Sequence, residues 1–400
     1  MSERVLQRLV GDPDALTHAR PVAPYDDRSI AFLAALSTAL LADVEAKGYG
    51  DVISFAYWCR RANLLKLKQD FAETRVRLGV GLVFHITPSN VPVNFAFSYA
   101  FALLAGNASL VRVPTRDFAQ TRIICRVLTS LLADARFAGI ADRTAFVRYE
   151  QDDAITRRFS EGCNARIIWG GDQAINNIRK FRMPERAVEI VFADRYSFCV
   201  MDAASIVRAD ATTLERLVSG FYNDTFLMDQ NACSSPHLVV WLGDDAATVA
   251  SAKARFWDAL HRYTAPKYDL QAVSAMDKYV LLCRNAIDLG TEAHVSRHGN
   301  FLYRVALEHL PDDIDAFRGN SGYFYEHTTA SLDTIAHIVN TKYQTLTYHG
   351  VERDVLSAFV VANGLSGIDR IVPIGQALNI GVIWDGYDVV RTLSRIVDVV

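Results

Sequence analysis

From residue 77 onward, short runs of uniformly apolar residues alternate with segments of helical length. Strands without polar alternation, separated by helices, are typical of a parallel sheet that is covered on both faces. Such sheets bind ligands at the carboxyl ends of their strands. The sequence therefore predicts an α/β fold. The predicted strands are residues 80–86, 109–113, 145–149, 165–169, 187–192 and 198–201, and the predicted helices are residues 92–105, 118–133, 152–160 and 173–181.

The pattern also divides the chain into domains. Residues 1–76 show helical periodicity and form an N-terminal helical segment, and residues 77–202 form a first α/β domain. A second α/β domain is predicted over residues 203–375, and residues 376–400 are expected to return to the core or to an oligomer contact. A chain of 400 residues, half of them hydrophobic, is long enough for two domains.

The charge balance limits the kinds of partner. Lys and Arg number 42 against 45 Asp and Glu, which gives a net charge of −3. Without a basic surplus, small-molecule or protein partners are favoured over nucleic acid. The first residues lack the apolar core of a secretory signal, so a cytoplasmic location is expected. Residues 91–105 are apolar but shorter than the roughly 20 residues of a spanning helix, and we predict a buried helix there.

The cysteines and histidines do not suggest a metal site. The six cysteines are scattered without any CxxC-type pair, which argues against structural zinc and against a disulfide framework. The ten histidines show no HExxH or comparable ligand spacing. We therefore predict no metal.

Cys233 is the candidate nucleophile. It lies in a polar turn, DQNACSSP, between a helical segment at 212–226 and an apolar strand at 237–242. Backbone amides that open a helix or a tight turn after a cysteine favour its thiolate, and a thiolate is a strong nucleophile. The alternative is a buried, unreactive cysteine, which is the commoner fate of cysteines in apolar chains.

Two strand ends supply further candidate groups. The stretch HITPSNVP holds Asn90 between Pro88 and Pro92, which is a rigid way to present a neutral hydrogen-bond donor to an oxyanion. The alternative is that Asn90 caps the following helix. The stretch IIWGGD ends a strand with Gly170 and Gly171, where a cofactor can approach the backbone; such glycine pairs are also ordinary turns.

Four motifs in order resemble those of the aldehyde dehydrogenase superfamily. They are TPSNVP at 87–92, LLAGNASLVRVP at 103–114, IIWGGD at 167–172 and DQNACSSP at 229–236. More narrowly, HITPSNVP, Arg112 and the segments GIDRIVPIG and WDGYDVVRTLSRIV near the C-terminus resemble acyl-CoA reductases of the LuxC type, the fatty acid reductase component of bacterial luminescence. The resemblance runs from about residue 77 to the C-terminus.

The resemblance implies a fold and a reaction. It implies an aldehyde dehydrogenase-like fold in which residues 77–202 bind a nicotinamide cofactor and residues 203–375 carry the nucleophile. Cys233 would attack an acyl thioester of CoA or of an acyl-carrier protein, while Asn90 and the Cys233 backbone amide hold the oxyanion. Hydride transfer would then release an aldehyde. Cofactor-binding positions carried over from the motifs are Thr87, Pro88, Ser89, Arg112, Thr115, Arg116, Gly170, Gly171 and Asp172.

Two departures from the superfamily pattern are informative. Aldehyde-oxidising members carry a general-base Glu in a segment that corresponds here to residues 191–197, where no Glu is present, and Glu189 is out of register. The loss favours reduction, because reduction needs no activated water. Where NAD-preferring relatives have a Lys followed three residues later by a Glu, this chain has Arg112 and Thr115 with Arg116 adjacent. A guanidinium can bind the 2′-phosphate on the ribose of NADPH, which NADH lacks, so NADPH is predicted over NADH.

Other functions stay open at this stage. The chain could be a non-catalytic subunit that binds acyl groups and docks an acyl transferase or synthetase, or it could be an ordinary aldehyde oxidiser. His237 and His349 are candidate proton donors, although a structural role is favoured for both. The terminal strand resembles the segment that superfamily members lend to a neighbouring subunit, which predicts a homo-oligomer.

Overall fold

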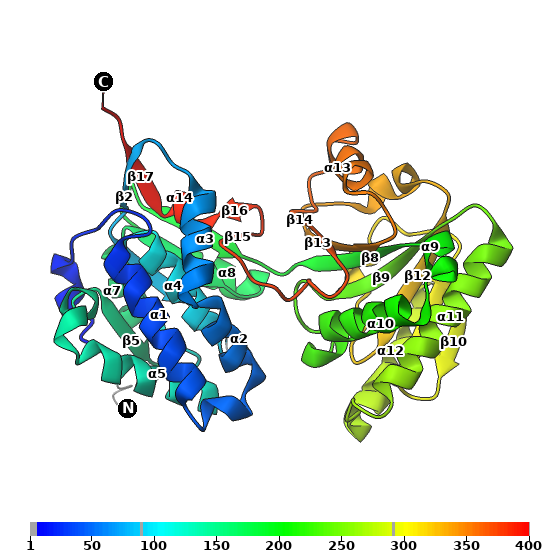
Figure 1. The fold of residues 1–400 in the computed structure, drawn as a ribbon, viewed down its shortest axis with the longest axis horizontal. Helices are drawn as coiled ribbons and strands as arrows, with labels where there is room; N and C mark the ends of the chain where they lie inside the picture. Colours follow the sequence, from blue (N-terminus) through cyan, green and yellow to red (C-terminus); the bar gives the residue numbers. More distant parts are fainter. Residues whose placement is uncertain (1–5, 89–90, 290–292, 400) are drawn as a thin grey trace. The chain divides into compact units, whose positions relative to one another are not determined.

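The computed structural model describes residues 6–88, 91–289 and 293–399. The chain forms two compact units (Figure 1). Unit 1 comprises residues 1–193 and 387–400, and unit 2 comprises residues 194–386. No helix in the described part of the chain combines the length and the apolar character needed to cross a bilayer.

Unit 1 is built on a six-stranded sheet in the order β1-β5-β4-β3-β6-β7. All neighbouring strands are parallel except β1, which pairs antiparallel to β5. The predicted parallel sheet is therefore confirmed for this region. The strands are β1 (Gln7–Val10), β3 (Leu82–Ile86), β4 (Ala108–Arg112), β5 (Thr144–Arg148), β6 (Ala165–Trp169) and β7 (Val188–Phe192).

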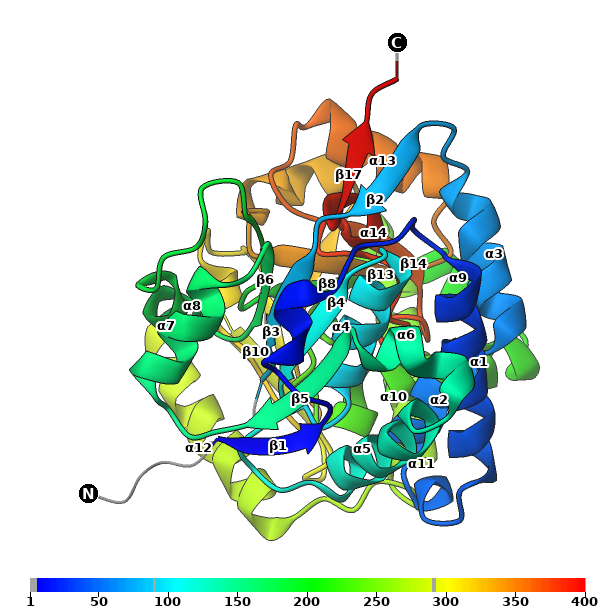
Figure 2. The same ribbon diagram turned by 90° about the vertical axis from the view of Figure 1, so that its left-hand side faces the viewer.

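Helices cover both faces of this sheet. In Figure 2, α7 and α8 lie on one side of the strands, and α1, α4 and α5 lie on the other. The helix α4 is almost entirely buried, as predicted for residues 91–105. The helices of unit 1 are α1 (Asp27–Ala42), α2 (Gly50–Trp58), α3 (Arg61–Phe71), α4 (Asn94–Leu104), α5 (Ala119–Leu132), α6 (Ala138–Ala141), α7 (Asp153–Glu161), α8 (Asp172–Arg179) and α14 (Val389–Thr392).

The strand order places a topological switch point between β3 and β6. The chain proceeds from β3 outward through β4 to β5 on one side, and then returns to β6 and β7 on the other side of β3. Helices that leave neighbouring strands in opposite directions open a crevice at their carboxyl ends. The segments that follow β3 and β6, which contain Thr87 and Gly170, are therefore adjacent at the edge where ligands bind.

The AGN motif has a structural role beside this sheet. Gly106 has a φ of +88°, and a Cβ atom there would lie 2.1 Å from the carbonyl oxygen of Val22. The Asn107 side chain accepts from the backbone N–H of Gly81 at 3.0 Å and donates to the carbonyl of Leu393 at 2.9 Å. The motif thus joins β3 to the C-terminal segment.

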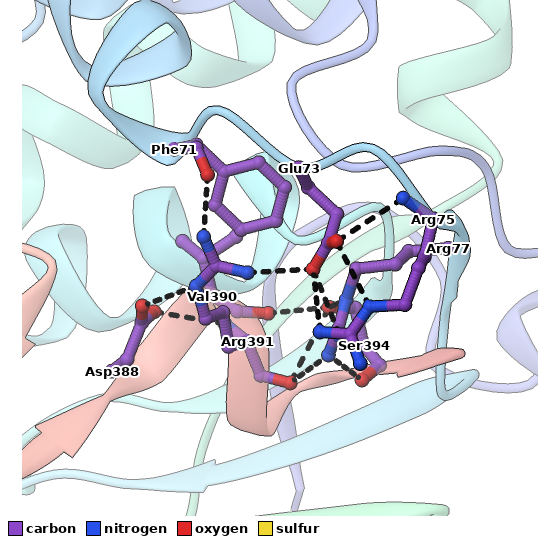
Figure 3. A network of polar contacts seen from close by, with 8 residues as sticks. All are labelled: Phe71, Glu73, Arg75, Arg77, Asp388, Val390, Arg391 and Ser394. Atoms are coloured by element: carbon purple, nitrogen blue, oxygen red, sulfur yellow. Dashed lines mark hydrogen bonds and ion pairs between the residues drawn. The ribbon is translucent and has the colours of Figure 1, made fainter.

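The C-terminal segment is tied into unit 1 by a second, two-stranded sheet and by a polar network. β2 (Val76–Gly79) pairs antiparallel to β17 (Ser394–Val397), which follows α14 and β16 (Tyr387–Asp388). Glu73 accepts from Arg77 at 3.4 Å and from Arg391 at 2.6 Å (Figure 3). Hydrogen bonds from Arg75 lower the pKa of Glu73 to about 2. The terminal strand thus pairs within its own chain.

Unit 2 contains a seven-stranded sheet in the order β10-β11-β12-β9-β8-β13-β14. The pairings that the structure describes are parallel except that of β10 with β11. The strands are β8 (Tyr196–Asp202), β9 (Pro236–Leu242), β10 (Ala293–His298), β11 (Leu302–Leu307), β12 (Tyr323–Thr329), β13 (Tyr343–His349) and β14 (Arg370–Pro373), with the short β15 (Ile383–Trp384) near its end. The helices are α9 (Ala203–Arg208), α10 (Ala211–Thr225), α11 (Ala246–Thr264), α12 (Ala272–Asp288) and α13 (Arg353–Ala362).

Two boundaries differ from the sequence analysis. The chain enters unit 2 after residue 193 rather than after residue 202, because β8 pairs with β9 and β13 of the second sheet. The segment 1–76 is not an independent helical segment, since β1 joins the sheet of unit 1 and α1 packs against α5.

Candidate active site

The Cys233 loop, defined as residues 229–235, connects the end of α10 to β9. The chain turns sharply here because Asp229 and Gln230 both have left-handed backbones, with φ of +50° and +62°. Non-glycine residues pay a cost for this conformation, so surrounding contacts must hold it in place. The loop is a turn rather than a helix, and β9 begins directly after it at Pro236.

Gln230 provides most of that support. Its side chain is fully buried, and its Nε2 donates to the carbonyls of Pro236 and Tyr323, each at 3.0 Å. Its Oε1 accepts from the backbone N–H groups of Gly322 at 3.1 Å and Tyr323 at 3.2 Å. A buried amide with four partners leaves no hydrogen-bonding capacity unused. Gln230 therefore fixes the loop to the start of β12.

Two buried serines hold the other end of the loop. Ser197 Oγ donates to the carbonyl of Cys233 at 2.7 Å and accepts from the backbone N–H of Thr345 at 3.1 Å. Ser235 Oγ donates to the carbonyl of Asp224 at 2.7 Å. The backbone of Cys233 is thus connected to β8 and β13 of the seven-stranded sheet.

Asp224, at the end of α10, connects this loop to the GIDRIVPIG motif. Its carboxylate accepts from the backbone N–H groups of Gly375 at 2.6 Å and Ala377 at 2.9 Å. Gly220 lies one helical turn earlier, where a Cβ atom would approach the Cα of Gly375 at 3.0 Å. Burial raises the pKa of Asp224 to about 6, although these amides lower it. The motif therefore packs against α10 through a close backbone contact.

Cys233 itself is exposed, and the reading of it as a buried cysteine is wrong. Its ionisation differs from expectation. Desolvation raises the pKa of the thiol to about 11, the carboxylates of Asp385 and Asp194 raise it further, and Arg318 lowers it. No helix starts after Cys233, so the expected stabilisation of a thiolate by helix amides is absent from the described structure. With this raised pKa, the Cys233 side chain is a protonated thiol at neutral pH.

The backbone amide of Cys233 donates to no other described residue. The Cys233 carbonyl, in contrast, is bound by Ser197. The amide interacts with its own sulfur and lowers the pKa of the thiol. An N–H group beside the nucleophile can bind the oxygen of a carbonyl that the sulfur attacks.

The high pKa of Cys233 predicts a strong pH dependence of alkylation. A thiol with a pKa of about 11 is about one part in 10⁴ ionised at pH 7. Because only the thiolate reacts, the rate with iodoacetamide should rise about tenfold per pH unit between pH 7 and 10. Asp385→Asn removes a carboxylate that raises the pKa, so the rate at pH 8 should increase about three- to tenfold.

The measurement uses a Cys283→Ser background, because Cys283 is the other exposed cysteine. Asp354→Asn is the matched control, since Asp354 is an exposed carboxylate at the start of α13. It should leave the rate unchanged. A rate that reaches its plateau below pH 8 would contradict the raised pKa.

In unit 1, the predicted cofactor residues cluster at the switch point. Thr87 and Pro88 follow β3, and Thr87 Oγ1 donates to the carbonyl of Arg112 at 2.8 Å, which joins the ends of β3 and β4. Beneath them, Ser98 Oγ contacts His85 Nδ1 at 2.8 Å and accepts from Trp169 Nε1 at 3.1 Å. Burial lowers the pKa of His85 to about 3, so this histidine is neutral and structural. Ser89 and Asn90 lie outside the described residues.

The glycine turn after β6 fits a ligand that lies against the backbone. A Cβ atom at Gly171 would meet no atom within 4 Å, and one at Gly170 would meet only Ala174, at 3.4 Å. Neither glycine has a positive φ, so backbone conformation does not require them. Asp172 opens α8 directly afterwards. The arrangement provides open backbone at the place where the fold binds cofactors.

The three residues predicted to select the cofactor differ in their surroundings. The Arg112 guanidinium lies 4.4 Å from the centroid of the Tyr149 ring and donates to the Tyr149 carbonyl at 3.3 Å. Thr115 is half-buried. Arg116 is exposed, with its guanidinium 5.1 Å from the Phe118 ring, and no described carboxylate pairs with it. Arg116 is therefore the cation more available to an anionic ligand.

The other polar candidates have structural surroundings. Glu189 is held between Arg166, at 2.5 Å, and Arg179, at 2.7 Å. His237 is buried and stacks on the Tyr196 ring, and burial lowers its pKa to about 4. His349 ends β13 and pairs in register with Met201, whereas Pro236 pairs with Ser197 at the opposite end of β8. About four residues of strand, or roughly 13 Å, separate these positions, so His349 is not beside the Cys233 loop.

The sequence analysis missed the charged groups around the thiol. Asp385 and Arg318 influence the pKa of Cys233, and Arg318 donates to Asp194 at 2.7 Å. Asp385 belongs to the motif WDGYDVVRTLSRIV, which could have drawn attention to it. In the described residues there is no group of three or more His, Cys, Asp or Glu that could hold a metal ion.

Known structures share this fold. Aldehyde dehydrogenase 21 from Physcomitrella patens, solved with the reaction product succinate, has a TM-score of 0.67 over 99% of this chain and 94% of that chain, at 12% identity. An aldehyde dehydrogenase described as putative, from Burkholderia cenocepacia, has a TM-score of 0.64 over 94% and 86%, at 14% identity. The fold is aldehyde dehydrogenase-like, and both fold and family imply a nicotinamide cofactor.

Curated relatives carry a narrower description. The long-chain acyl-protein thioester reductase of Photorhabdus luminescens is 22% identical over 323 residues, which are 79% of this chain and 62% of that protein. The protein of the same name from Vibrio harveyi is 24% identical over 326 residues, or 79% and 63%. This chain thus spans about three fifths of the length of these relatives. The sequence profile described as acyl-CoA reductase (LuxC) matches residues 60–398. The chain therefore belongs to the acyl-CoA reductase (LuxC) family.

Proposed function

We propose that this protein reduces an acyl thioester to an aldehyde through an acyl intermediate on Cys233, with NADPH as the reductant. The observation that carries the proposal is an exposed cysteine on a loop fixed by buried hydrogen bonds, with its own backbone N–H free of other described partners. Family membership supports the acyl thioester as substrate, either acyl-CoA or an acyl-carrier protein.

Acylation balances without an external base. The Cys233 sulfur forms a bond to the acyl carbon, the carbon–sulfur bond of the substrate breaks, and the proton of the Cys233 thiol leaves on the departing thiol. A cysteine that is protonated in the resting state is compatible with this exchange. The Cys233 amide, together with Asn90, would bind the carbonyl oxygen while it carries negative charge.

Reduction follows on the same sulfur. When bound, the reduced nicotinamide supplies a hydride to the acyl carbon. Thr87, Pro88, Gly170, Gly171 and Asp172 would hold the cofactor along the switch point, with Ser89 assigned from the motif. Release of the aldehyde returns Cys233 as a thiolate, and its raised pKa favours the uptake of a proton from solvent.

The surroundings support reduction over hydrolysis. Hydrolysis of an acyl-cysteine needs a base that activates water. Glu189 is bound to two arginines and lies on β7 of unit 1, and it offers no free carboxylate for that task. The described structure therefore gives no support to aldehyde oxidation.

The preference for NADPH rests on Arg116. Arg116→Ala should raise the KM for NADPH about 10- to 100-fold, because a charge-assisted contact to the 2′-phosphate is lost. The KM for NADH, which lacks that phosphate, should change less than twofold. Steady-state kinetics with both cofactors measures the difference.

Arg186→Ala is the matched control for this prediction. Arg186 is another exposed arginine of unit 1 without a described ion-pair partner, and its loss should not alter either KM. Equal increases of both KM values in Arg116→Ala would contradict a contact to the 2′-phosphate.

The direct test of the function is NADPH oxidation by the purified protein against acyl-CoAs of graded chain length, with the aldehyde product trapped. The reaction should show one aldehyde formed per NADPH consumed. Binding of acyl-CoA without NADPH oxidation would instead indicate a non-catalytic subunit that serves an acyl transferase or synthetase. NADPH production from long-chain aldehydes alone would indicate an aldehyde oxidiser.

A further inference from the structure

The helix α12 of unit 2 carries apolar side chains on two faces, one packed against the core and one exposed. Five apolar or weakly polar side chains recur at helical spacing along one face, and these residues define the α12 stripe: Val273, Met276, Val280, Cys283 and Ile287. Val273, Met276, Val280 and Ile287 are 65%, 61%, 41% and 82% exposed, and Cys283 is exposed as well. Intervals of three and four residues place them on one side of the helix.

The opposite face packs against the core of unit 2 through Leu281, Leu282 and Leu289, and it also buries two polar side chains. Lys278 is 0% exposed and Asn285 is 6% exposed, and they lie seven residues apart. Lys278 Nζ donates to the carbonyls of Asn300, Phe301 and Ser321 at 2.5, 3.1 and 2.7 Å. The Asn285 side chain donates to the hydroxyls of Tyr323 and Tyr325.

These buried contacts fix the rotation of the helix. Turning α12 to cover its exposed apolar face would uncover Leu281, Leu282 and Leu289 and would leave a buried ammonium and several carbonyls without partners. The stripe therefore stays on the surface. Contiguous apolar surface of this kind marks a contact site in a soluble protein.

The charges beside the stripe identify the partner. Asp277 and Arg284 are both exposed, neither has a described ion-pair partner, and they lie on the same edge of the stripe, seven residues apart. If two α12 helices pack antiparallel about a two-fold axis beside Val280, Asp277 of each copy faces Arg284 of the other. The same arrangement sets Val273 opposite Ile287 and Val280 opposite Val280. A two-fold contact requires a surface that is complementary to itself, and this pattern meets that requirement.

We propose that α12 is a self-association surface, on which a second copy of this chain packs antiparallel through the α12 stripe, with two symmetric Asp277–Arg284 pairs. The proposal is independent of the reaction at Cys233, because the stripe, Lys278 and Asn285 take no part in the proposed chemistry.

A cross-linking experiment tests the two-fold axis. Val280→Cys in a Cys283→Ser background places one thiol of each copy beside the axis, so mild oxidation of the full chain should give a covalent dimer in most molecules. Ser251→Cys in the same background is the control, because Ser251 is an exposed position on α11. It should give less than a tenth of that dimer. Equal yields in both variants would overturn the proposal.

Charge reversal tests the partner's identity. Asp277→Arg or Arg284→Asp alone brings like charges together twice and should reduce the cross-linking rate of Val280→Cys at least tenfold. The combination of both reversals exchanges the charges and should restore the rate to within threefold of its original value. Failure of the double variant to recover, with circular dichroism showing intact folding, would rule out antiparallel self-pairing. Contact with a different protein predicts no such recovery.

Discussion

Replacement of Cys233 by alanine is expected to abolish covalent acylation of the protein and aldehyde formation together. The proposed reaction passes through a bond between the acyl carbon and this sulfur, and alanine offers no atom that can form it. With radioactive acyl-CoA, the unmodified protein should retain label through denaturation until hydroxylamine releases it. Cys233→Ala should retain none and should oxidise NADPH at the background rate.

The position of Cys233 makes this variant informative. Its side chain is exposed, while Gln230, Ser197 and Ser235 hold the loop through other atoms. Alanine should therefore change the free energy of unfolding by less than about 0.5 kcal/mol, as exposed substitutions usually do. Cys283→Ser is the control, since it removes an exposed thiol that has no role in the chemistry. Label or aldehyde persisting in Cys233→Ala would refute the proposed intermediate.

The parallel strands were the part of the fold that the sequence predicted best. Strands such as Ala165–Trp169 are apolar at every position, because helices cover both faces of the sheet. β12 was not predicted, since Glu326 interrupts it. In the structure Glu326 is buried and its Oε1 accepts from the indole N–H groups of Trp241 at 2.8 Å and Trp257 at 2.7 Å. Arg304 also pairs with this carboxylate at 3.6 Å. All three partners are distant in the sequence, so no local pattern predicts them.

The helix α12 was also not predicted from the sequence. Its apolar residues fall on two faces, because the α12 stripe is exposed while Leu281, Leu282 and Leu289 pack against the core, so no single apolar face marks the helix. The strand β1 was assigned to a helical segment, because four residues carry too little periodicity to separate a strand from a helix. Both errors concern elements whose environment is set by tertiary partners.

At the candidate site, the sequence located the nucleophile but not its ionisation. A polar turn next to a strand was enough to single out Cys233. Its pKa depends on desolvation by the surrounding chain and on Asp385 and Asp194, which lie 152 and 39 residues away from it in the sequence. These carboxylates raise the pKa of the thiol, whereas local reasoning from turn amides predicted a lower value. A local sequence pattern can thus identify a reactive residue, while the pKa of that residue depends on groups that only the folded unit brings near it.

Asn90→Ala is expected to slow acylation roughly 100-fold or more while the protein stays folded, because loss of one oxyanion donor usually costs 10²- to 10³-fold in rate. Asn90 is assigned from the TPSNVP motif, and the Cys233 amide is the second donor in the proposed site. A single-turnover assay should therefore show slower labelling of Cys233 by acyl-CoA, with unchanged NADPH binding.

The size of the remaining rate distinguishes the roles of Asn90. The helix α4 begins at Asn94 with Val93 at its N-cap position, so capping of this helix does not account for Asn90. If Asn90 takes no part in the chemistry, Asn90→Ala should leave the acylation rate within threefold. Asn90→Asp supplies the second comparison, because aspartate has nearly the same size as asparagine but, when ionised, repels an oxyanion. Slow acylation in both variants, with normal stability in Asn90→Asp, fits the oxyanion role; a normal rate in Asn90→Asp contradicts it.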